Sequence, residues 1–429
     1  MTPTEAPAAS PGTRRILLAS LVGTSVEFYD FYIYATATSL VFGPLFFPST
    51  SPSAQLLAAY ASFGLAFLAR PIGGILFGHF GDRVGRKSTL VASLMLMGIA
   101  TFLIAFLPPY AAIGWAAPAL LCLLRLAQGL GLGGEWSGAA LLATENAPPG
   151  WSGRFGSVPQ FGAPIGFIAA NGFFLVLGAM LTPAQFLAWG WRLPFLASAI
   201  LVALGLWVRL KLVETPAFRA ALEEAPPAAV PLSEVMRGHL GLTIAGTFGV
   251  IVCFAIYYLS TAFALGYGTT KLGYDRQSFL AVQLGAILFL AAGIGLAGWA
   301  SDRFRPSTVM LWGCVGAIVS GVALAPLLGG GSLGKVFLFL ALALFTMGFV
   351  YGPLGAWLTN LYPARVRYTA TALAFNLGGI IGGGFTPAVA QLLATRGGLG
   401  LVGAYLGGAA MLSMIGIVAA RRATMRTPA

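Results

Sequence analysis

The stretch TSVEFYDFYIY, residues 24–34, lies inside an apolar segment that runs from about residue 16 to residue 42. A helix of roughly 20 residues crosses the hydrocarbon core of a bilayer, so this segment is long enough to span a membrane. Two carboxylates in it, Glu27 and Asp30, are three residues apart and share one face of the expected helix. Because a charged group at membrane depth costs on the order of 3 kcal/mol, residues elsewhere in the chain must meet these carboxylates.

The composition is that of a polytopic membrane protein. Of the 429 residues, 58% are hydrophobic and 8% are charged, whereas soluble domains carry about 25% charged residues. Arg14 and Arg15 precede a full-length span, which argues against a cleavable signal peptide. Cys122, Cys253 and Cys314 lie in apolar segments, and their spacing indicates neither a disulfide framework nor a metal site. We therefore expect no cofactor.

Alternating apolar segments and polar loops predict an all-α integral membrane protein with twelve transmembrane helices. The expected helices of the first half cover residues 16–42, 54–80, 88–107, 117–144, 155–178 and 191–212. Those of the second half cover residues 240–267, 278–300, 308–328, 336–362, 368–394 and 399–420. The polar stretch 214–239 is expected to link the halves 16–213 and 240–420, with terminal tails at 1–15 and 421–429.

The distribution of basic residues predicts the orientation. With both termini on one side, that side holds 17 of the 24 lysines and arginines, and the opposite loops hold five. Since cytoplasmic loops are enriched in Lys and Arg, we expect cytoplasmic termini in the plasma (inner) membrane. The net charge of +12 is therefore explained by topology, and no nucleic-acid partner is expected.

The chain also contains an internal repeat. GHFGDR at residues 78–83 follows the second helix of the first half, and GWASDR at residues 298–303 follows the second helix of the second half. Two six-helix halves related by such a repeat place a substrate site at their interface, near the middle of the membrane.

Several motifs resemble those of a known transporter family. GHFGDRVGRK at residues 78–87 resembles the signature loop of the major facilitator superfamily, and RLAQGLGLGGEW at residues 125–136 resembles that superfamily's motif on the fourth helix. SVEFYDFYIY, FLARPIGG, GGEWSGAALLATENAP, WGWRLPF and GGGFTPAVA resemble the metabolite:proton symporter family, over about residues 14–421. The resemblance implies transport of carboxylates such as shikimate, 2-oxoglutarate or citrate, or of zwitterions such as proline or glycine betaine. The second-half loop SDRFRP departs from the signature because it lacks the glycine and the paired basic ending.

Five charged residues lie deep inside the expected spans, away from the span ends: Glu27, Asp30, Glu135, Arg70 and Arg125. Charges at this depth face the bundle interior and pair with one another. Three acids for two arginines leave one carboxyl that desolvation and like charge push towards protonation, which suits a proton carrier. The resemblance implies that Arg125 matches a fourth-helix arginine involved in proton coupling. The alternative is that all five form fixed ion pairs that hold the first half together.

The two loops of the repeat are expected to change partners between conformations. Their residues are Gly78, Gly81, Asp82, Arg83, Gly85, Arg86 and Lys87, with Glu145 as a candidate partner, and Asp302 and Arg303 in the second copy. The alternative is that these charges only cap helices and satisfy the excess of basic residues inside.

Other polar or aromatic residues within the spans are candidates for the substrate site. They are Tyr34, Gln160, Asn171, Tyr257, Tyr258, Tyr351 and Asn376, besides Arg70 and Arg125. Each could instead pack, or form a hydrogen bond between helices.

Together these features predict a secondary active transporter that moves a small organic acid with protons by alternating access. Arg70 and Arg125 would dock the carboxylate through two parallel hydrogen bonds, and Asp30, Glu27 or Glu135 would carry the proton. An alternative is a betaine- or proline-like zwitterion held by aromatic rings. An alternative of another class is a membrane receptor that does not transport. The sequence shows no nucleophile–base pair and no Walker-type loop, so we expect neither an enzyme nor an ATP-driven pump. The protein is expected to act as a monomer.

Overall fold

The computed structural model describes residues 11–48, 51–84, 86–210, 231–364 and 366–426, and leaves the side chains of 11–12, 78, 81–88, 90, 208–209, 231 and 426 undescribed. Every element of this part of the chain is helical. The first half contains α1 (Pro11–Ala37), η1 (Thr38–Phe42), α2 (Gly43–Phe46), α3 (Pro52–Val84), α4 (Arg86–Ile104), α5 (Tyr110–Ile113), α6 (Ala116–Leu132), α7 (Glu135–Glu145), α8 (Ser152–Ser157), η2 (Pro159–Phe161), α9 (Gly162–Met180), α10 (Pro183–Ala188), η3 (Gly190–Arg192) and α11 (Leu193–Leu210).

The second half begins with the short helix α13 (Pro231–Gly238), which lies in the segment expected to be a linker; the rest of that linker is mostly outside the described residues. It continues with α14 (Leu240–Tyr258), η4 (Leu259–Phe263), α15 (Ala264–Thr270), α16 (Arg276–Ser301), α17 (Pro306–Leu328), α18 (Leu333–Thr359), α19 (Arg367–Gly379), η5 (Ile380–Gly384) and α20 (Thr386–Arg426).

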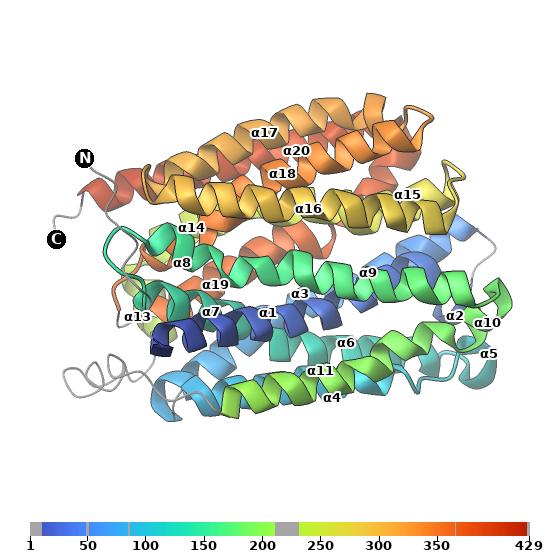
Figure 1. Cartoon of the computed structure of the whole chain (residues 1–429), viewed down its shortest axis with the longest axis horizontal. Helices are drawn as coiled ribbons and strands as arrows, with labels where there is room; N and C mark the ends of the chain where they lie inside the picture. The colour runs from blue at the N-terminus through green and yellow to red at the C-terminus, as the bar shows by residue number, and fades with distance from the viewer. Residues whose placement is uncertain (1–10, 49–50, 85, 211–230, 365, 427–429) are drawn as a thin grey trace.

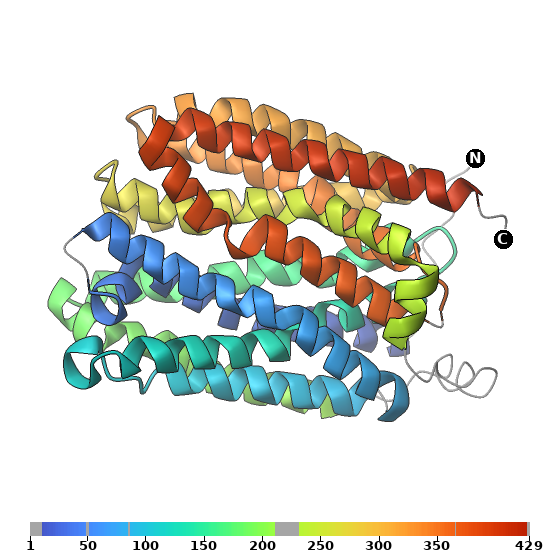
Figure 2. The same ribbon diagram turned by 180° about the vertical axis from the view of Figure 1, so that it is seen from behind.

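These helices account for the twelve expected crossings. Ten helical runs among the described residues are long and apolar enough to span a membrane, and α4 contributes a shorter apolar helix, Val91–Ile104. The last run, Arg367–Met425, crosses twice because it turns at Gly397 and Gly398, where Gly398 has a φ of 75°. Figure 2 shows this run returning along its own length, and Figure 1 shows α1 starting at the end of the molecule where α20 finishes. We call this the termini end and the opposite end the far end.

Side chains close several turns at the far end. Asp275 caps α16 by accepting a hydrogen bond from the Ser278 N–H at 2.9 Å. This backbone donor lowers the pKa of the Asp275 carboxyl, because it stabilises the ionised form. Thr182 caps α10 in a capping box with Gln185.

One expected span, which the structure forms as a single helical run, is irregular at its middle. The segment 117–144 was expected to be continuous, but α6 ends at Leu132 and α7 begins at Glu135. Gly133 and Gly134 interrupt it, and the other half of the molecule bonds both of their carbonyl groups, as described below. Helix propensity and hydrophobicity do not reveal this break, because glycine is also common in continuous membrane helices.

The two halves meet along helices from both repeats. From the first half, α8 and α9 pack on α16, α3 packs on α19 and η5, and α7 packs on α18 and α19. Small residues make this approach close: a methyl group added at Gly153 would lie 2.7 Å from the Gly298 carbonyl oxygen. Small residues at helix interfaces let backbones approach within van der Waals distance, where packing and hydrogen bonds stabilise the pair.

Candidate functional site

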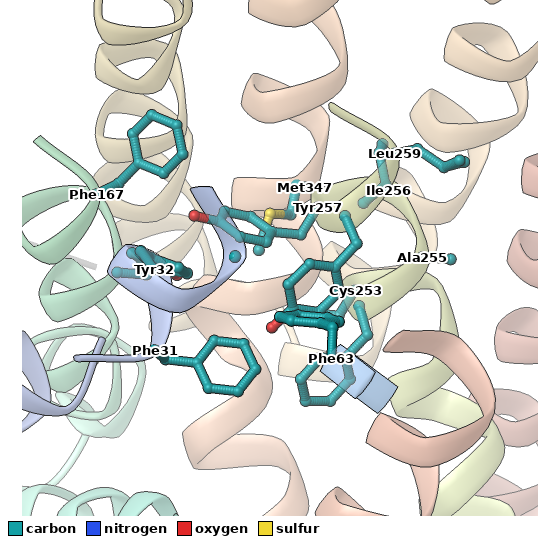
Figure 3. Close-up of a cluster of buried hydrophobic side chains, with 14 of the residues drawn as sticks. Phe31, Tyr32, Phe63, Phe167, Cys253, Ala255, Ile256, Tyr257, Leu259 and Met347 are labelled. Carbon is teal, nitrogen blue, oxygen red and sulfur yellow. The ribbon is translucent and has the colours of Figure 1, made fainter. Parts of the chain in front are cut away.

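A small cavity lies between the halves. Its walls come from α1, α3, α6 and α9 of the first half and from α14, α18 and α19 of the second. Most of the lining is aromatic, and Figure 3 shows how the Tyr32 ring of α1 faces the Tyr257 ring of α14. A concave apolar site with few convergent polar groups is the usual form of a small-molecule site.

Glu27 and Arg70 are the charged residues among those lining this cavity in the described chain. Their side chains approach to 3.7 Å between Arg70 Nη2 and Glu27 Oε1, and both residues are at most 4% exposed. The Arg70 guanidinium also lies 5.2 Å from the centre of the Phe67 ring and 5.5 Å from that of Phe31. The ion pair is longer than a hydrogen bond, so Arg70 and Glu27 attract each other without a direct hydrogen bond between these two atoms.

Arg125 lies outside the cavity lining. Its guanidinium stands 4.0 Å from the centre of the Tyr34 ring and 4.5 Å from that of Phe31, and it donates a hydrogen bond to Gln128 Oε1 at 3.0 Å. Gln128 in turn donates to Thr101 at 2.7 Å. Cation–π contacts and this polar chain therefore hold Arg125 in the interior of the first half.

Asp30 and Glu135 are also buried in the first half, away from the cavity lining. Ser198 and Thr101 lie beside Asp30, but within the described residues neither carboxylate oxygen accepts a hydrogen bond. Glu135 accepts a hydrogen bond from Ser93 at 3.1 Å. Buried polar groups are normally hydrogen-bonded, so the surroundings of Asp30 differ from those of Glu135.

Three of the polar or aromatic candidates line the cavity: Tyr257, Tyr258 and Tyr351. The other four have partners elsewhere. The Tyr34 hydroxyl pairs with Ser62, Gln160 accepts from the Trp136 indole, Asn171 accepts from Thr36, and Asn376 donates to the Gly133 carbonyl.

Sequence reasoning missed part of the lining, namely Phe28, Cys253, Phe254, Met347 and Phe375. Phe28 belongs to the aromatic stretch of the first helix, which was a usable signal. The others are apolar residues in apolar helices, so nothing in their type separates a lining residue from a packing residue.

The termini end of the cavity is closed by contacts between the halves. The Tyr368 hydroxyl donates to the Gly134 carbonyl at 2.6 Å, and the Asn376 amide donates to that of Gly133 at 2.7 Å. Between them, the Trp136 and Phe375 rings stack with centres 3.6 Å apart. Thus α19 of the second half covers the break between α6 and α7.

A second contact at the termini end involves the repeated loop. Asp302 forms an ion pair with Arg154, with 2.9 Å between Oδ2 and Nε, and accepts a hydrogen bond from the Gly153 N–H at 2.8 Å. Burial raises the pKa of the Asp302 carboxyl, and the two backbone donors and Arg154 offset part of that rise. Arg303 instead lies over the Trp299 ring at 3.9 Å. The first-copy residues Asp82, Arg83, Gly85, Arg86 and Lys87 lie outside the described side chains, so the prediction for that loop stays a prediction.

At the far end, the Tyr32 and Tyr257 rings stack at 5.3 Å across the interface. Beyond them, the Tyr60 hydroxyl of α3 donates to the Ala262 carbonyl of η4 at 2.7 Å. Contacts between the halves therefore lie at both ends of the cavity.

A family comparison agrees with this architecture. The model of the Major Facilitator Superfamily matches residues 20–387. The chain belongs to the major facilitator superfamily. The inner membrane metabolite transport protein YhjE of Escherichia coli is 46% identical over 94% of this chain and 93% of its own length. The E. coli shikimate transporter is 38% identical over 89% and 88%.

The fold of this superfamily member also matches a solved structure. The proton:xylose symporter XylE bound to 6-bromo-6-deoxy-D-glucose superimposes with a TM-score of 0.71, at 17% identity, over 98% of this chain and 97% of XylE. The expected fold class is confirmed, and the chain is a multi-pass membrane transporter rather than an enzyme.

Proposed function

We propose that this transporter carries a small organic acid together with protons by alternating access. The ion pair between Glu27 and Arg70 supports the proposal, because it places one guanidinium and one carboxyl group in the wall of the cavity. An incoming carboxylate would take the guanidinium in bidentate geometry. Glu27 would then be less well compensated and favour its protonated form, so that acid and proton travel together.

The other buried acids extend the path for the proton. Asp30 lies on the same helix as Glu27, and Glu135 follows the break between α6 and α7. Arg125 stands behind Phe31 and would stabilise whichever of these acids is ionised through its field rather than through the substrate.

The remaining assignments of this proposal follow from topology. The halves 16–213 and 240–420 would rock about the cavity, with the tails and the linker 214–239 on the cytoplasmic side of the inner membrane. The excess of basic residues at the termini end supports this orientation. The protein would work as a monomer, because each half contributes walls to the same cavity.

The aromatic lining favours one alternative, a zwitterion such as betaine or proline, whose cationic group could bind over the rings. A receptor that binds without transport is the alternative of another class. Both substrate classes carry a carboxylate that Arg70 could bind, so they differ in the second group: only the zwitterion presents a cationic group to the aromatic rings of the cavity.

The test is thermal unfolding of the purified protein with a panel of organic acids, betaine and proline. Ligands that bind the native state raise the unfolding temperature. We expect stabilisation by acids in wild type and its loss in Arg70→Gln, followed by accumulation of the same acid in proteoliposomes with a proton gradient. Stabilisation by betaine alone supports the zwitterion, and binding without flux supports the receptor.

A further inference from the structure

Two tyrosine hydroxyls in the cavity wall have no hydrogen-bond partner in the described chain. They belong to Tyr257 on α14 and Tyr351 on α18, and each residue is 3% exposed. Tyr32 lies close to the first and Trp136 close to the second, but neither approach has hydrogen-bond geometry. Buried hydroxyls are normally paired, so these two groups point to a partner that the protein itself does not provide.

The two hydroxyls and the ion pair stand on opposite walls of one cavity. Glu27 and Arg70 come from α1 and α3 of the first half, while both tyrosines come from the second half. Ring contacts fix the tyrosines in place: Tyr257 stacks on Tyr32 at 5.3 Å, and Tyr351 meets the edge of Phe28 at 6.4 Å. The hydroxyls are therefore preorganised, with little freedom to turn away to other partners.

This arrangement fits a ligand with a carboxylate at one end and hydroxyl groups at the other. A ligand hydroxyl both donates and accepts, so it can satisfy a tyrosine hydroxyl in either role. A trimethylammonium group can do neither and would leave both tyrosines unsatisfied. A purely apolar ring would have the same defect, since it would bury the tyrosine hydroxyls without a bond.

We propose that Tyr257 and Tyr351 select hydroxyl-bearing carboxylates over carboxylates that lack the hydroxyl groups. The proposal rests on the proposed function, because it takes Arg70 as the dock for the carboxylate. The further proposal concerns the hydroxyl groups of the ligand, and it assigns their recognition to helices α14 and α18. A site built to bond a hydroxyl discriminates strongly against the analogue without it, because the buried groups of the site are then unpaired.

The experiment measures Kd for two pairs of acids on the purified full-length protein. Shikimate is paired with cyclohex-1-ene-1-carboxylate, and 4-hydroxybenzoate with benzoate, so that the members of each pair share the ring and the carboxylate. The variants are Tyr257→Phe and Tyr351→Phe. The matched control is Tyr405→Phe, which removes a hydroxyl bonded to Thr386 at 2.6 Å, outside the cavity.

We expect wild type to bind the hydroxylated member of at least one pair about tenfold more tightly or better. Each cavity variant should weaken that acid about tenfold and change its partner less than about twofold, which removes the preference. Tyr405→Phe should keep the wild-type preference.

Equal affinity of wild type for both members of both pairs overturns the proposal and leaves the proposed function standing; this comparison requires no variant to fold. Equal weakening of both members by the cavity variants also overturns it. If none of the four acids binds while betaine does, the proposed function fails first, and the selection of hydroxyl groups fails with it.

Discussion

At the scale of single residues, the two buried arginines have different surroundings. Arg70 shares the cavity with Glu27, whereas Arg125 is surrounded by Tyr34, Phe31 and the Gln128 amide. The sequence assigns both arginines to a substrate carboxylate, because it reveals only their depth in the membrane and their charge. Both guanidinium groups lie over the Phe31 ring, but only Arg70 is among the residues that line the cavity in the described chain.

A first prediction compares these two arginines. Arg70→Lys should weaken binding of a transported acid about tenfold, because the lysine loses the planar fork that binds a carboxylate through two hydrogen bonds. Arg125→Lys should change Kd less than Arg70→Lys does, and should instead lower the unfolding temperature through lost ring contacts. Titration calorimetry and thermal unfolding of the same two proteins measure both quantities. A larger loss of affinity in Arg125→Lys would place Arg125 in the substrate site.

A second prediction concerns the proton carrier. Glu27→Gln mimics permanent protonation, so it should abolish accumulation driven by a proton gradient while sparing exchange of substrate between equal compartments. Asp30→Asn is measured beside it, since Asp30 is the acid without a hydrogen bond in the described structure. The assays are counterflow and gradient-driven uptake in proteoliposomes. Should both variants still concentrate substrate, the first helix does not carry the proton and Glu135 becomes the candidate.

At the scale of elements, the break between α6 and α7 is a joint that the other half of the protein stabilises. Tyr368 and Asn376 on α19 bond the two glycine carbonyls at the break. The Gly134 carbonyl also accepts a long backbone hydrogen bond from the Gly138 N–H at 3.4 Å, whereas the Gly133 carbonyl would lose its side-chain donor with Asn376. A buried carbonyl without a donor is costly in a membrane. Opening towards the termini end must therefore break or replace these two bonds.

A third prediction follows for this joint. Tyr368→Phe and Asn376→Ala should raise the rate at which a small thiol reagent reaches Cys253, a cavity-lining residue that is 2% exposed. The increase should be about fivefold to tenfold for each lost bond. The other two cysteines are first replaced by alanine.

The control for the joint is Tyr362→Phe, because the Tyr362 hydroxyl donates to the Leu242 carbonyl within the second half at 3.3 Å. This variant also loses a hydrogen bond from a tyrosine hydroxyl to a carbonyl group, but both partners of that bond belong to the second half. If Tyr362→Phe accelerates the labelling of Cys253 as much as Tyr368→Phe does, the effect is a general loosening and not the release of the joint.

A fourth prediction concerns Asp302, which caps α8 from the other half. Asp302→Ala removes the acceptor and should accelerate Cys253 labelling, whereas Asp302→Asn keeps an acceptor oxygen and should stay near wild type. Burial raises the pKa of the Asp302 carboxyl in the closed state. At pH values between the ordinary and the raised pKa, closing of the protein is therefore accompanied by uptake of a proton on Asp302. Labelling of wild type should therefore slow as the pH falls through that window, and Asp302→Asn should lose this pH dependence. Faster labelling of Cys253 in wild type at low pH would contradict the role given to Asp302 protonation.

At the scale of the whole molecule, both ends of the cavity are closed in the same structure. Tyr60 and Ala262 close the far end, and Asp302 and Arg154 close the termini end. In the proposed alternating-access cycle, one set of contacts would open while the other holds. The two sets use different helices, α3 with η4 and α8 with the end of α16, so each can break independently.

A fifth prediction concerns orientation. Lys271 lies in the turn before α16 at the far end, so Lys271→Cys should react with a membrane-impermeant maleimide in intact cells. A cysteine in place of Arg422, at the termini end of α20, should react only after the cells are permeabilised. The reverse pattern would invert the topology while leaving the fold unchanged.

The amino-acid sequence by itself determined the membrane class, the twelve crossings and the repeat. Each of these rests on properties that a segment carries alone: the length of an apolar run, the charge of a loop and the recurrence of GHFGDR as GWASDR. The five buried charged residues were identified in the same way, because a charged residue within an apolar segment can be recognised without knowledge of its partners.

Only the tertiary structure decided which of these residues share a cavity. Glu27 and Asp30 are three positions apart on one helix, yet Glu27 faces the other half and Asp30 faces the interior of its own. Asn376 and Tyr351 are both polar positions in apolar helices, yet one bonds a glycine carbonyl and the other presents a hydroxyl without a partner to the cavity. The physical reason is that a partner is set by how helices from two halves pack, and this packing depends on contacts between residues hundreds of positions apart.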